Sequence, residues 1–476
     1  MTTAPDPHQV LAELWHASGH DPAALEAVEL SGKEPALPSS FAVGTVAQAT
    51  IAAAALAAAE LWRLRGGKRQ AIRVPMRDAG IEFRSERYLR VDGKPAAEIW
   101  DKIAGLYRCG DGRWVRLHTN YPHHRDGVLA LLKCDYDRAA MQAALTRWRA
   151  EDFETAAAEA GLVVTACRSF AEWDRHDQAL AIAQLPLFSI DRIGDAPPKP
   201  LPPGDRPLAG VKVLELTRVI AGPVCGRTFA AHGADVLLVT AAHLPSTEVC
   251  VIDTGRGKLS AAIDLRSASG RDTLRALLRD ADVLVQGYRP GAIAAHGFGP
   301  DEAARIRPGI VYVSLSAYGH AGPWAMRRGF DSLVQTASGF NDAEGRVFGA
   351  AAPKPLPCQA LDHGTGYLMA FAAMTALARR ARHGGSWHVR ASLAQTGHWL
   401  RSLGRIDGMS APDPGFDDLR DRLEDSDSGF GRLTAVRHAA VMADTPPRWA
   451  QPSVPLGTHA PAWPNGPHAV LAHELR

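Results

Sequence analysis

The chain has 476 residues, which is too many for one ordinary domain and enough for two or three domains with sizeable cores. Hydrophobic residues make up 46% and charged residues 22%, a globular rather than a disordered composition. A net charge of +2 excludes the broad basic surface that nucleic acid would need. The six cysteines form no CxxC pair, so neither a zinc site nor a redox motif is indicated.

Targeting signals are not evident, and we expect a cytoplasmic protein. The N-terminus lacks the basic region and following apolar region of a signal peptide. The most apolar run, residues 46–62, is too short and too rich in alanine to be a convincing membrane span. We therefore expect no contact with a membrane.

The first two regions of the chain differ in pattern. Residues 1–92 contain one strong predicted helix, about 46–64, which ends at Gly66-Gly67 and precedes a strand-like run at 71–76. Residues 93–197 predict a compact α+β domain. Its candidate elements are a strand within 112–121 and helices at 137–148 and 150–161.

A proline-rich linker, residues 198–206, is the clearest boundary in the chain. Beyond it, residues 207–404 alternate short apolar strands with helices, which predicts parallel βαβ units and an α/β doubly wound sheet. Residues 405–476 are rich in Pro, Asp and Gly and are predicted to be an irregular connecting tail. The expected strands are 211–216, 235–239, 282–287 and 310–316, and the expected helices are 223–233, 268–281 and 301–308.

Two distant segments, 46–76 and 364–394, share one pattern. Each has a helix of small residues, an Arg-rich last turn, a Gly-Gly stop and a strand; the arginines suit a helix C-terminus. Aligned without gaps, Gly44 falls opposite Asp362, so the first copy lacks the carboxylate. The similarity indicates a partial internal repeat, although two alanine-rich helices can also match by chance.

Asp362 stands at the start of the second of these helices. Asp is a favoured N-cap residue, and spacing alone would make Asp362 a cap. A carboxylate in this position can also act as a nucleophile if water is removed and the group is well positioned. The pattern alone leaves both interpretations open.

The strand–turn–helix beginning at 211 is compatible with a nucleotide, so an NAD-linked oxidoreductase must be considered. The turn has no GxGxxG fingerprint, and no acidic residue follows the second strand. Anion-binding candidates lie elsewhere: Arg256 and Lys258 stand beside two glycines, and Arg289 follows a strand end. The alternative for each of them is a solvated cation in a turn.

Residues 207–239, 256–291 and 308–339 resemble, in this order, the family III CoA-transferases of the CaiB/BaiF type. This family includes formyl-CoA and carnitine-CoA transferases and α-methylacyl-CoA racemases. The resemblance covers about 207–400, and residues 93–197 resemble the small domain of the same family. It implies a Rossmann-like large domain. The order of segments implies a permuted or tandem-fused member in which 1–92 is a degenerate first copy.

The resemblance makes Asp362 the nucleophile. It implies attack on an acyl-CoA thioester, an aspartyl-acyl anhydride, an aspartyl-CoA thioester, and transfer of CoA to a carboxylic acid. Coenzyme A would be a substrate, and no resident cofactor or metal would be required. The family's interlocked homodimers imply either such a dimer or a pseudo-dimeric tandem monomer.

Further residues are expected around Asp362. The Gly364-Thr365-Gly366 step would leave room for a pantetheine arm, and free N–H groups of the helix N-terminus would stabilise an oxyanion. The small-domain residues His118 and Asn120 are expected near the substrate. The expected CoA contacts are Arg218, Ala221, Gly222, Pro223, Arg256, Lys258, Arg289, Tyr318 and Gly319.

Besides the NAD-linked oxidoreductase, which the missing fingerprint and the missing acidic residue weaken, three alternatives remain. An isomerase or racemase of the same family shares the aspartate, but the position of the racemase histidine is Phe330 here, and a phenyl ring cannot move a proton. An inactive CoA-binding paralogue is a second alternative, because the segment 240–250 is short and no glycine-rich lid is evident. A metal site at His118, His123, His124 and Asp126 is a third and is not favoured, because the spacing fits no helix face.

Overall fold

The structure is a computed structural model that describes residues 4–464. Its centre is a seven-stranded sheet in the order β11-β10-β9-β12-β13-β14-β8. The first six of these strands are parallel, and β8 pairs with β14 antiparallel at the edge. The strands are β8 Phe188–Gly194, β9 Lys212–Leu216, β10 Asp235–Thr240, β11 Lys258–Ala262, β12 Val283–Gln286, β13 Val311–Ser316 and β14 Ser386–Ser392.

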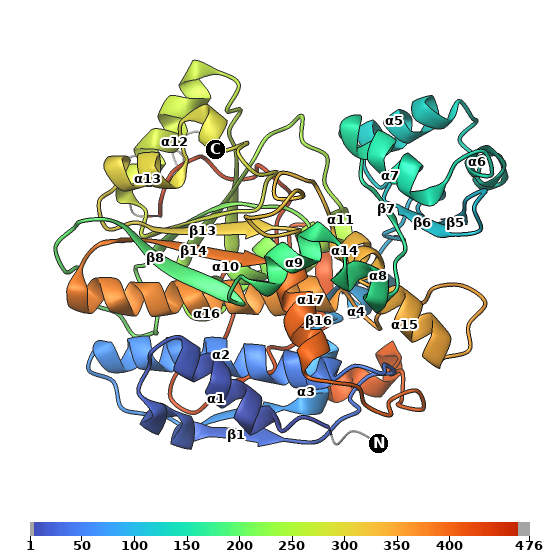
Figure 1. The fold of residues 1–476 in the computed structure, drawn as a ribbon. Coiled ribbons are helices and arrows are strands. Elements are labelled where there is room, and N and C mark those ends of the chain that lie inside the picture. Colours follow the sequence, from blue (N-terminus) through green and yellow to red (C-terminus); the bar gives the residue numbers. More distant parts are fainter. Residues whose placement is uncertain (1–3, 465–476) are drawn as a thin grey trace.

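Helices cover both faces of this sheet, so the predicted α/β class with a large parallel sheet is confirmed (Figure 1). If the six parallel strands are numbered 1 to 6 along the chain from β9 to β14, their order across the sheet is 3-2-1-4-5-6, which is the order of doubly wound sheets. The helices α12 and α13 lie on one face, and α16 lies on the other, in contact with α10. Their bounds are α10 Ala221–Ala231, α12 Ala268–Asp280, α13 Pro300–Ile306 and α16 Ala360–His383.

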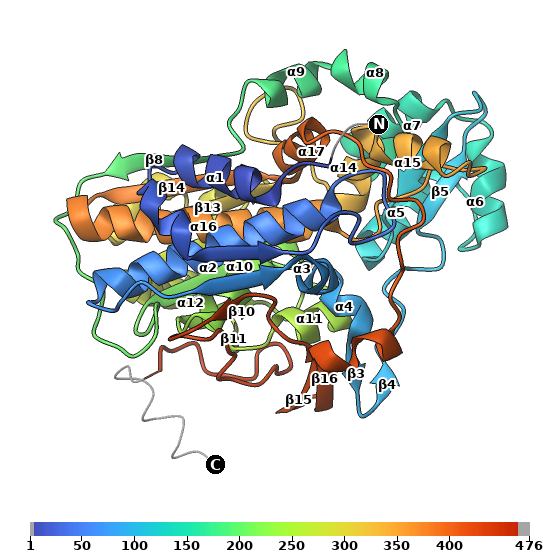
Figure 2. The same ribbon diagram turned by 90° about the horizontal axis from the view of Figure 1, so that it is seen from below.

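The N-terminal segment forms a further layer outside α16 (Figures 1 and 2). Its long helix, α2, packs along α16, so the two segments of similar sequence pattern lie side by side. By length and composition α2 could cross a membrane, but all of its apolar window is buried within the fold. The segment comprises α1 Pro7–Ala17, η1 Pro22–Ala27, β1 Val28–Ser31, α2 Val43–Leu64, β2 Ile72–Pro75, α3 Met76–Glu82 and α4 Ser85–Tyr88.

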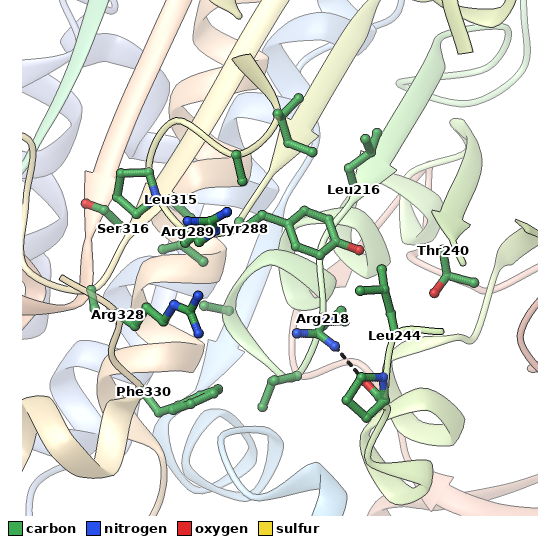
Figure 3. A pocket seen from close by; sticks show the side chains of 18 of the residues that line it. Leu216, Arg218, Thr240, Leu244, Tyr288, Arg289, Leu315, Ser316, Arg328 and Phe330 are labelled. Atoms are coloured by element: carbon green, nitrogen blue, oxygen red, sulfur yellow. Dashed lines mark hydrogen bonds between the residues drawn. The ribbon is translucent and has the colours of Figure 1, made fainter. Parts of the chain in front are cut away.

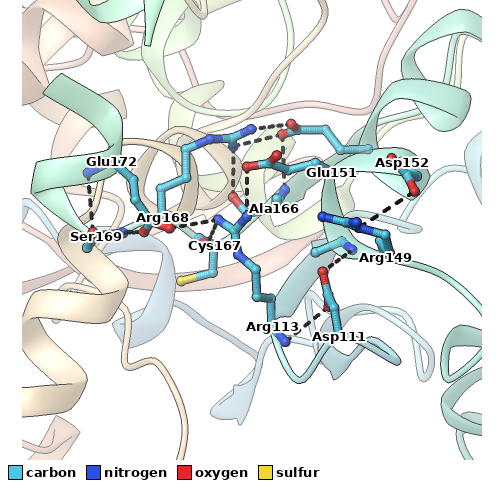
Figure 4. Close-up of polar contacts among 12 residues, drawn as sticks. Asp111, Arg113, Arg149, Glu151, Asp152, Ala166, Cys167, Arg168, Ser169 and Glu172 are labelled. Carbon is cyan, nitrogen blue, oxygen red and sulfur yellow. Dashed lines mark hydrogen bonds and ion pairs between the residues drawn. The ribbon is translucent and has the colours of Figure 1, made fainter. Parts of the chain in front are cut away.

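The small domain is a three-stranded antiparallel sheet, β5-β6-β7, with three helices and its own apolar core. Arg168, just after this domain, forms a buried ion pair with Glu154, and Arg113 pairs with Glu151 and Glu172 (Figure 4). These contacts tie the domain to α8. The elements of the domain are β5 Gly105–Arg108, β6 Trp114–Leu117, α5 Pro122–Leu132, α6 Arg138–Leu145, α7 Ala150–Glu159 and β7 Val164–Ala166. The helices α8 Phe170–Asp174 and α9 Asp177–Ala183 follow it.

The remaining helices after β10 lie near the carboxyl ends of the strands or around α16. They are α11 Glu248–Thr254, η2 Ala294–His296, α14 Asp331–Ala337, α15 Phe340–Val347 and α17 Leu393–Ser402.

Two expectations about the organisation need correction. The strand β8 lies within the predicted small domain but pairs with β14, so it belongs to the large sheet. The tail 405–476 is not simply irregular, because within its described part β16 pairs with β3 and β17 pairs with β2. The elements concerned are β3 Arg90–Val91, β4 Lys94–Pro95, η3 Phe416–Arg422, β15 Leu423–Ser428, β16 Gly431–Val436 and β17 Val441–Met442.

Candidate active site

A cavity of about 450 Å³ lies at the carboxyl ends of the parallel strands (Figure 3), and residues of the small domain also line it. Ligands of open α/β sheets bind at this edge because the strand order reverses there and leaves a crevice. His123, His124 and Val163 supply the small-domain wall. The lining residues at or just after successive strand ends include Arg218, Ala241, Ile263, Tyr288 and Ala317.

Asp362 lines this cavity from the first turn of α16. The N-cap of that helix is Gln359, so Asp362 is not the cap that spacing alone suggested. Its side chain is only 7% exposed, and no residue within 4–464 donates a hydrogen bond to its carboxylate. A buried carboxylate without a partner is costly for the fold, which makes it a candidate for chemistry rather than for stability.

A second carboxylate, Asp331 at the start of α14, holds the first turn of α16. Its Oδ2 accepts the backbone N–H of Asp362 at 2.9 Å, and its own side chain is 1% exposed. Burial raises the pKa of Asp331 to about 6. This N–H is therefore already used, and the expectation that free N–H groups here would stabilise an oxyanion is wrong for Asp362.

The pKa of Asp362 is raised well above its usual value, first by burial and then by the neighbouring carboxylates of Asp331 and Glu86. Glu86 comes from α4 in the N-terminal segment, and its Oε2 lies 3.2 Å from Nε2 of His363. The N-terminal segment therefore contributes directly to the surroundings of Asp362. When ionised, a carboxylate of raised pKa is also a more basic nucleophile.

Three arginines make the cavity a site for anions. Arg218, Arg289 and Arg328 line it and lie on its inner surface in Figure 3. Within the described part of the chain, no carboxylate forms an ion pair with any of the three. Arg218 donates to the carbonyl of Pro245 at 2.6 Å, which fixes its position without neutralising it. The cavity can therefore bind a ligand with several negative charges, such as phosphates.

The structure brings three of the nine expected CoA contacts to the cavity: Arg218, Ala221 and Arg289. Lys258 instead opens strand β11 and is buried in an ion pair with Glu215 at 2.7 Å. Arg256 is buried against Asp253 at 3.0 Å. Both cations are thus used inside the fold. The remaining expected contacts that do not line the cavity are Gly222, Pro223, Tyr318 and Gly319.

The two glycines after Asp362 serve helix packing, so the expected space for a pantetheine arm is not there. A Cβ on Gly366 would lie 2.6 Å from the carbonyl oxygen of Ala221, and one on Gly364 would lie 3.3 Å from Cγ1 of Val46. Glycine therefore lets α10 and α2 approach α16 closely.

Neither expected small-domain contact lines the cavity. His118 is buried and stacks on Phe330 with ring centroids 3.8 Å apart, so it lies behind that cavity-lining ring. Asn120 bonds the backbone of Ile99 and Asp101 within its own domain.

Sequence reasoning missed several residues of the site. Asp331 stands directly before a helical pattern, and that signal could have identified it as a group near a helix start. His123 and His124 entered only as metal candidates, yet they begin α5 and line the cavity. Glu86 carried no sequence signal, because its role depends on the packing of the N-terminal segment against α16.

Known proteins share this sequence pattern. The profile of CoA-transferase family III matches residues 208–411. An acyl-CoA transferase of Gibberella moniliformis is 30% identical over 78% of this chain and 73% of its own length. An acetyl-coenzyme A transferase of Hypoxylon pulicicidum is 38% identical over 45% of this chain, which spans only 37% of that protein.

A probable fatty acyl-CoA transferase of Mycobacterium tuberculosis is 31% identical over 38% of this chain and 48% of its own length. A crystal structure of a protein from the same organism covers 41% of this chain and 56% of its own, at 30% identity and a TM-score of 0.39. The assignment rests on the family profile and on the Gibberella relative, of whose sequence this chain covers 73%. The chain belongs to CoA-transferase family III.

Proposed function

We propose that this protein moves CoA between an acyl-CoA donor and a carboxylic acid, with Asp362 as the covalent nucleophile. The observation that carries the proposal is a buried carboxylate without a hydrogen-bond donor among the described residues, in the lining of a cavity that also holds three arginines with no described carboxylate partner. The names of the relatives, which include succinate–glutarate CoA-transferase of Agrobacterium fabrum, are consistent with this chemistry.

The first half of the reaction transfers CoA to the enzyme. A carboxylate oxygen of Asp362 attacks the thioester carbonyl carbon, the C–S bond breaks, and CoA leaves as a thiolate, giving a mixed anhydride. The thiolate then attacks the carbonyl carbon of Asp362. The bond to the acyl oxygen breaks, the donor acid leaves as a carboxylate, and an aspartyl-CoA thioester remains. No net proton is consumed.

The second half reverses these steps with the acceptor acid. Its carboxylate attacks the aspartyl thioester carbon and releases the thiolate, which then attacks the acyl carbon of the new anhydride. This step forms the product thioester and restores the Asp362 carboxylate. Burial at Asp362 would protect both intermediates from water, and Arg218 and Arg289 would neutralise the phosphates of CoA.

We also propose that one chain supplies both halves of a pseudo-dimer, as a cytoplasmic protein. The packing of α2 along α16 and the contact of Glu86 with His363 support this, because each joins the N-terminal segment to the large domain. An interlocked homodimer is the alternative assembly. Light scattering of the purified full chain would distinguish the two.

The test is CoA exchange measured with a panel of acyl-CoA donors and acid acceptors. We expect Asp362→Ala to reduce the rate by a factor of about 10³ or more, since it removes the covalent nucleophile. Asp342→Asn, a change of another aspartate outside the cavity, is the matched control and should leave the rate within about twofold.

Unchanged exchange in Asp362→Ala would refute the proposal. Deuterium uptake at the α-carbon of the acyl group, without exchange, would instead favour the isomerase or racemase alternative. Binding of CoA without either reaction would favour an inactive paralogue.

A further inference from the structure

A short stretch of the N-terminal segment, residues 83–86, lies against the start of α16. Nε of Arg84 donates to the carbonyl of Pro357 at 3.0 Å, just before the helix begins. The ring of Phe83 stacks on that of His363, in the first turn, with the ring centroids 5.3 Å apart. The N-terminal segment therefore holds the start of α16 both ahead of its first turn and within that turn.

Glu86 contacts the residue that directly follows Asp362. Its Oε2 lies 3.2 Å from Nε2 of His363. An ionised carboxylate only accepts hydrogen bonds, so Nε2 of the ring carries the hydrogen and donates it. The other ring nitrogen, Nδ1, is enclosed and has no hydrogen-bond partner within residues 4–464. Among the described residues, Glu86 is therefore the group whose hydrogen bond orients this imidazole.

Both partners of this contact are buried. Glu86 is 4% exposed and His363 is 0% exposed. Removing a carboxylate from water is costly, and apolar side chains of similar size often fill such a space with equal or greater stability. The stability of the fold therefore does not account for a charged side chain at this place.

Glu86 also acts on Asp362 by its charge. After burial, which is the first cause, the carboxylates of Asp331 and Glu86 raise the pKa of Asp362. Nε of Arg87, whose side chain is 43% exposed, lies 4.0 Å from Oε1 of Glu86. The titratable groups that lie near Asp362, Glu86 or His363 on the elements packed there are Arg87 on α4, Cys250 and Asp253 on α11, Asp331 on α14, and Cys358 just before α16.

We propose that Glu86 is a positioning residue, which fixes the first turn of α16 through His363 and so holds the Asp362 carboxylate in place for attack on the thioester. The role rests on the proposed function and extends it to the N-terminal segment. That segment carries Gly44 where α16 carries Asp362, yet it would supply a group on which the rate at Asp362 depends. Displacing a reacting group by about 1 Å can slow a reaction by about 10²-fold.

The rate at which an acyl-CoA labels Asp362 tests this role in the full chain, with the acyl-CoA that reacts fastest with the unchanged protein. We expect Glu86→Ala and His363→Ala each to slow labelling by about tenfold to a hundredfold. Binding of CoA, measured by calorimetry, should stay within about twofold, which shows that the cavity is still formed. The double variant should be no slower than either single variant, because both residues act through one contact.

The conservative variant Glu86→Gln separates position from charge. Its amide oxygen can still accept from His363, so most of the rate lost in Glu86→Ala should return. Its negative charge is gone, so the acid limb of the pH profile of labelling should move to lower pH. Glu82→Gln is the matched control, since Glu82 is also buried, at 2% exposed. Glu82 accepts from Tyr367 and from the backbone of Ala439, so this variant should leave the limb in place.

The outcomes separate this role from the proposed function. If Asp362 is labelled equally fast in Glu86→Ala and in the unchanged chain, only the positioning role fails. Additive losses in the double variant, or an acid limb that stays in place in Glu86→Gln, would also overturn it. If Glu86→Ala no longer binds CoA, the comparison of Glu86→Gln with Glu82→Gln decides. If no acyl group reaches Asp362 in the unchanged chain, the proposed function fails, and the positioning role fails with it.

Discussion

The helices α2 and α16 begin with similar support from outside segments, but at one aligned position α2 carries Gly44 and α16 carries Asp362. Each first turn donates a backbone N–H to a carboxylate from an outside segment: Thr45 to Glu34 at 2.6 Å in α2, and Asp362 to Asp331 at 2.9 Å in α16. Where α16 carries Asp362 facing a cavity, α2 carries Gly44 against packed atoms. In both helices a carboxylate from outside holds the first turn in place. The difference is that, within the described residues, only α16 has a cavity beside that turn, so a substrate can reach a side chain only there.

The largest effect is expected from placing the carboxylate on the wrong helix. A Cβ on Gly44 would lie 2.6 Å from Cβ of Ala36 and 2.9 Å from Oε2 of Glu34. Gly44→Asp should therefore lower the free energy of unfolding by about 2–4 kcal/mol through overpacking and charge repulsion, without creating a second reactive site.

Chemical denaturation measures this loss. Gly415→Asp is the matched control, because an added Cβ there meets nothing nearer than 3.6 Å, and we expect a change within about 0.5 kcal/mol. If Gly44→Asp were stable and acquired an acyl group at residue 44 from acyl-CoA, the claimed difference between the two helix starts would be wrong.

A smaller effect concerns the cost of keeping Asp362 ionised. Its pKa in the folded protein is raised, so the folded state binds its proton more tightly than the unfolded state. The stabilisation from this proton is complete below the unfolded pKa, near 3.8, and is lost as pH rises through the folded pKa. Asp362→Asn should therefore be more stable than the original protein at pH 8, by about 1 kcal/mol or more, with a smaller difference at pH 4.

Denaturation at a series of pH values measures this difference. If Asp362→Asn were less stable than the original protein at pH 8, the ionised carboxylate would stabilise the fold. Asp362 would then be a structural residue, and the contrast between Asp362 and Gly44 would be wrong.

The smallest effect is expected when Asp331, the carboxylate that accepts the backbone N–H of Asp362, is replaced by Asn. Asp331→Asn keeps an oxygen that can accept the N–H of Asp362 but removes a negative charge that raises the pKa of Asp362. The acid limb of the pH profile of kcat/KM should therefore move to lower pH, with the maximum rate reduced by less than about tenfold. Asp342→Asn, outside the cavity, should leave the limb in place. A shift to higher pH would contradict the account.

The elements that could be predicted from the sequence are those defined by a pattern of neighbouring residues. The strands β9, β10, β12 and β13 are runs of buried apolar residues, and the helices between them follow the expected period, so strand–helix alternation was enough to predict the large sheet. The position of Asp362 came from the resemblance to the family, because the pattern alone also fitted a helix cap.

The rest depends on neighbours that are distant in the chain. Residues 256–258 were taken for a phosphate-binding turn because Arg256 and Lys258 stand beside glycines, yet Glu215 of β9, two strands away in the sheet, forms an ion pair with the lysine. The tail strands β16 and β17 are short, and they pair with β3 and β2, which are distant in the chain. Gly364 was read as space for a ligand, whereas the facing helix α2 occupies that space.

The most direct test of the central claim is peptide mass spectrometry after incubation of the full chain with acyl-CoAs and trapping by hydroxylamine or borohydride. We predict a mass change on the peptide containing Asp362, none on the peptide containing Gly44, and none in Asp362→Ala. A protein that exchanges CoA while Asp362 stays unmodified, or that is modified at another residue, would contradict the account.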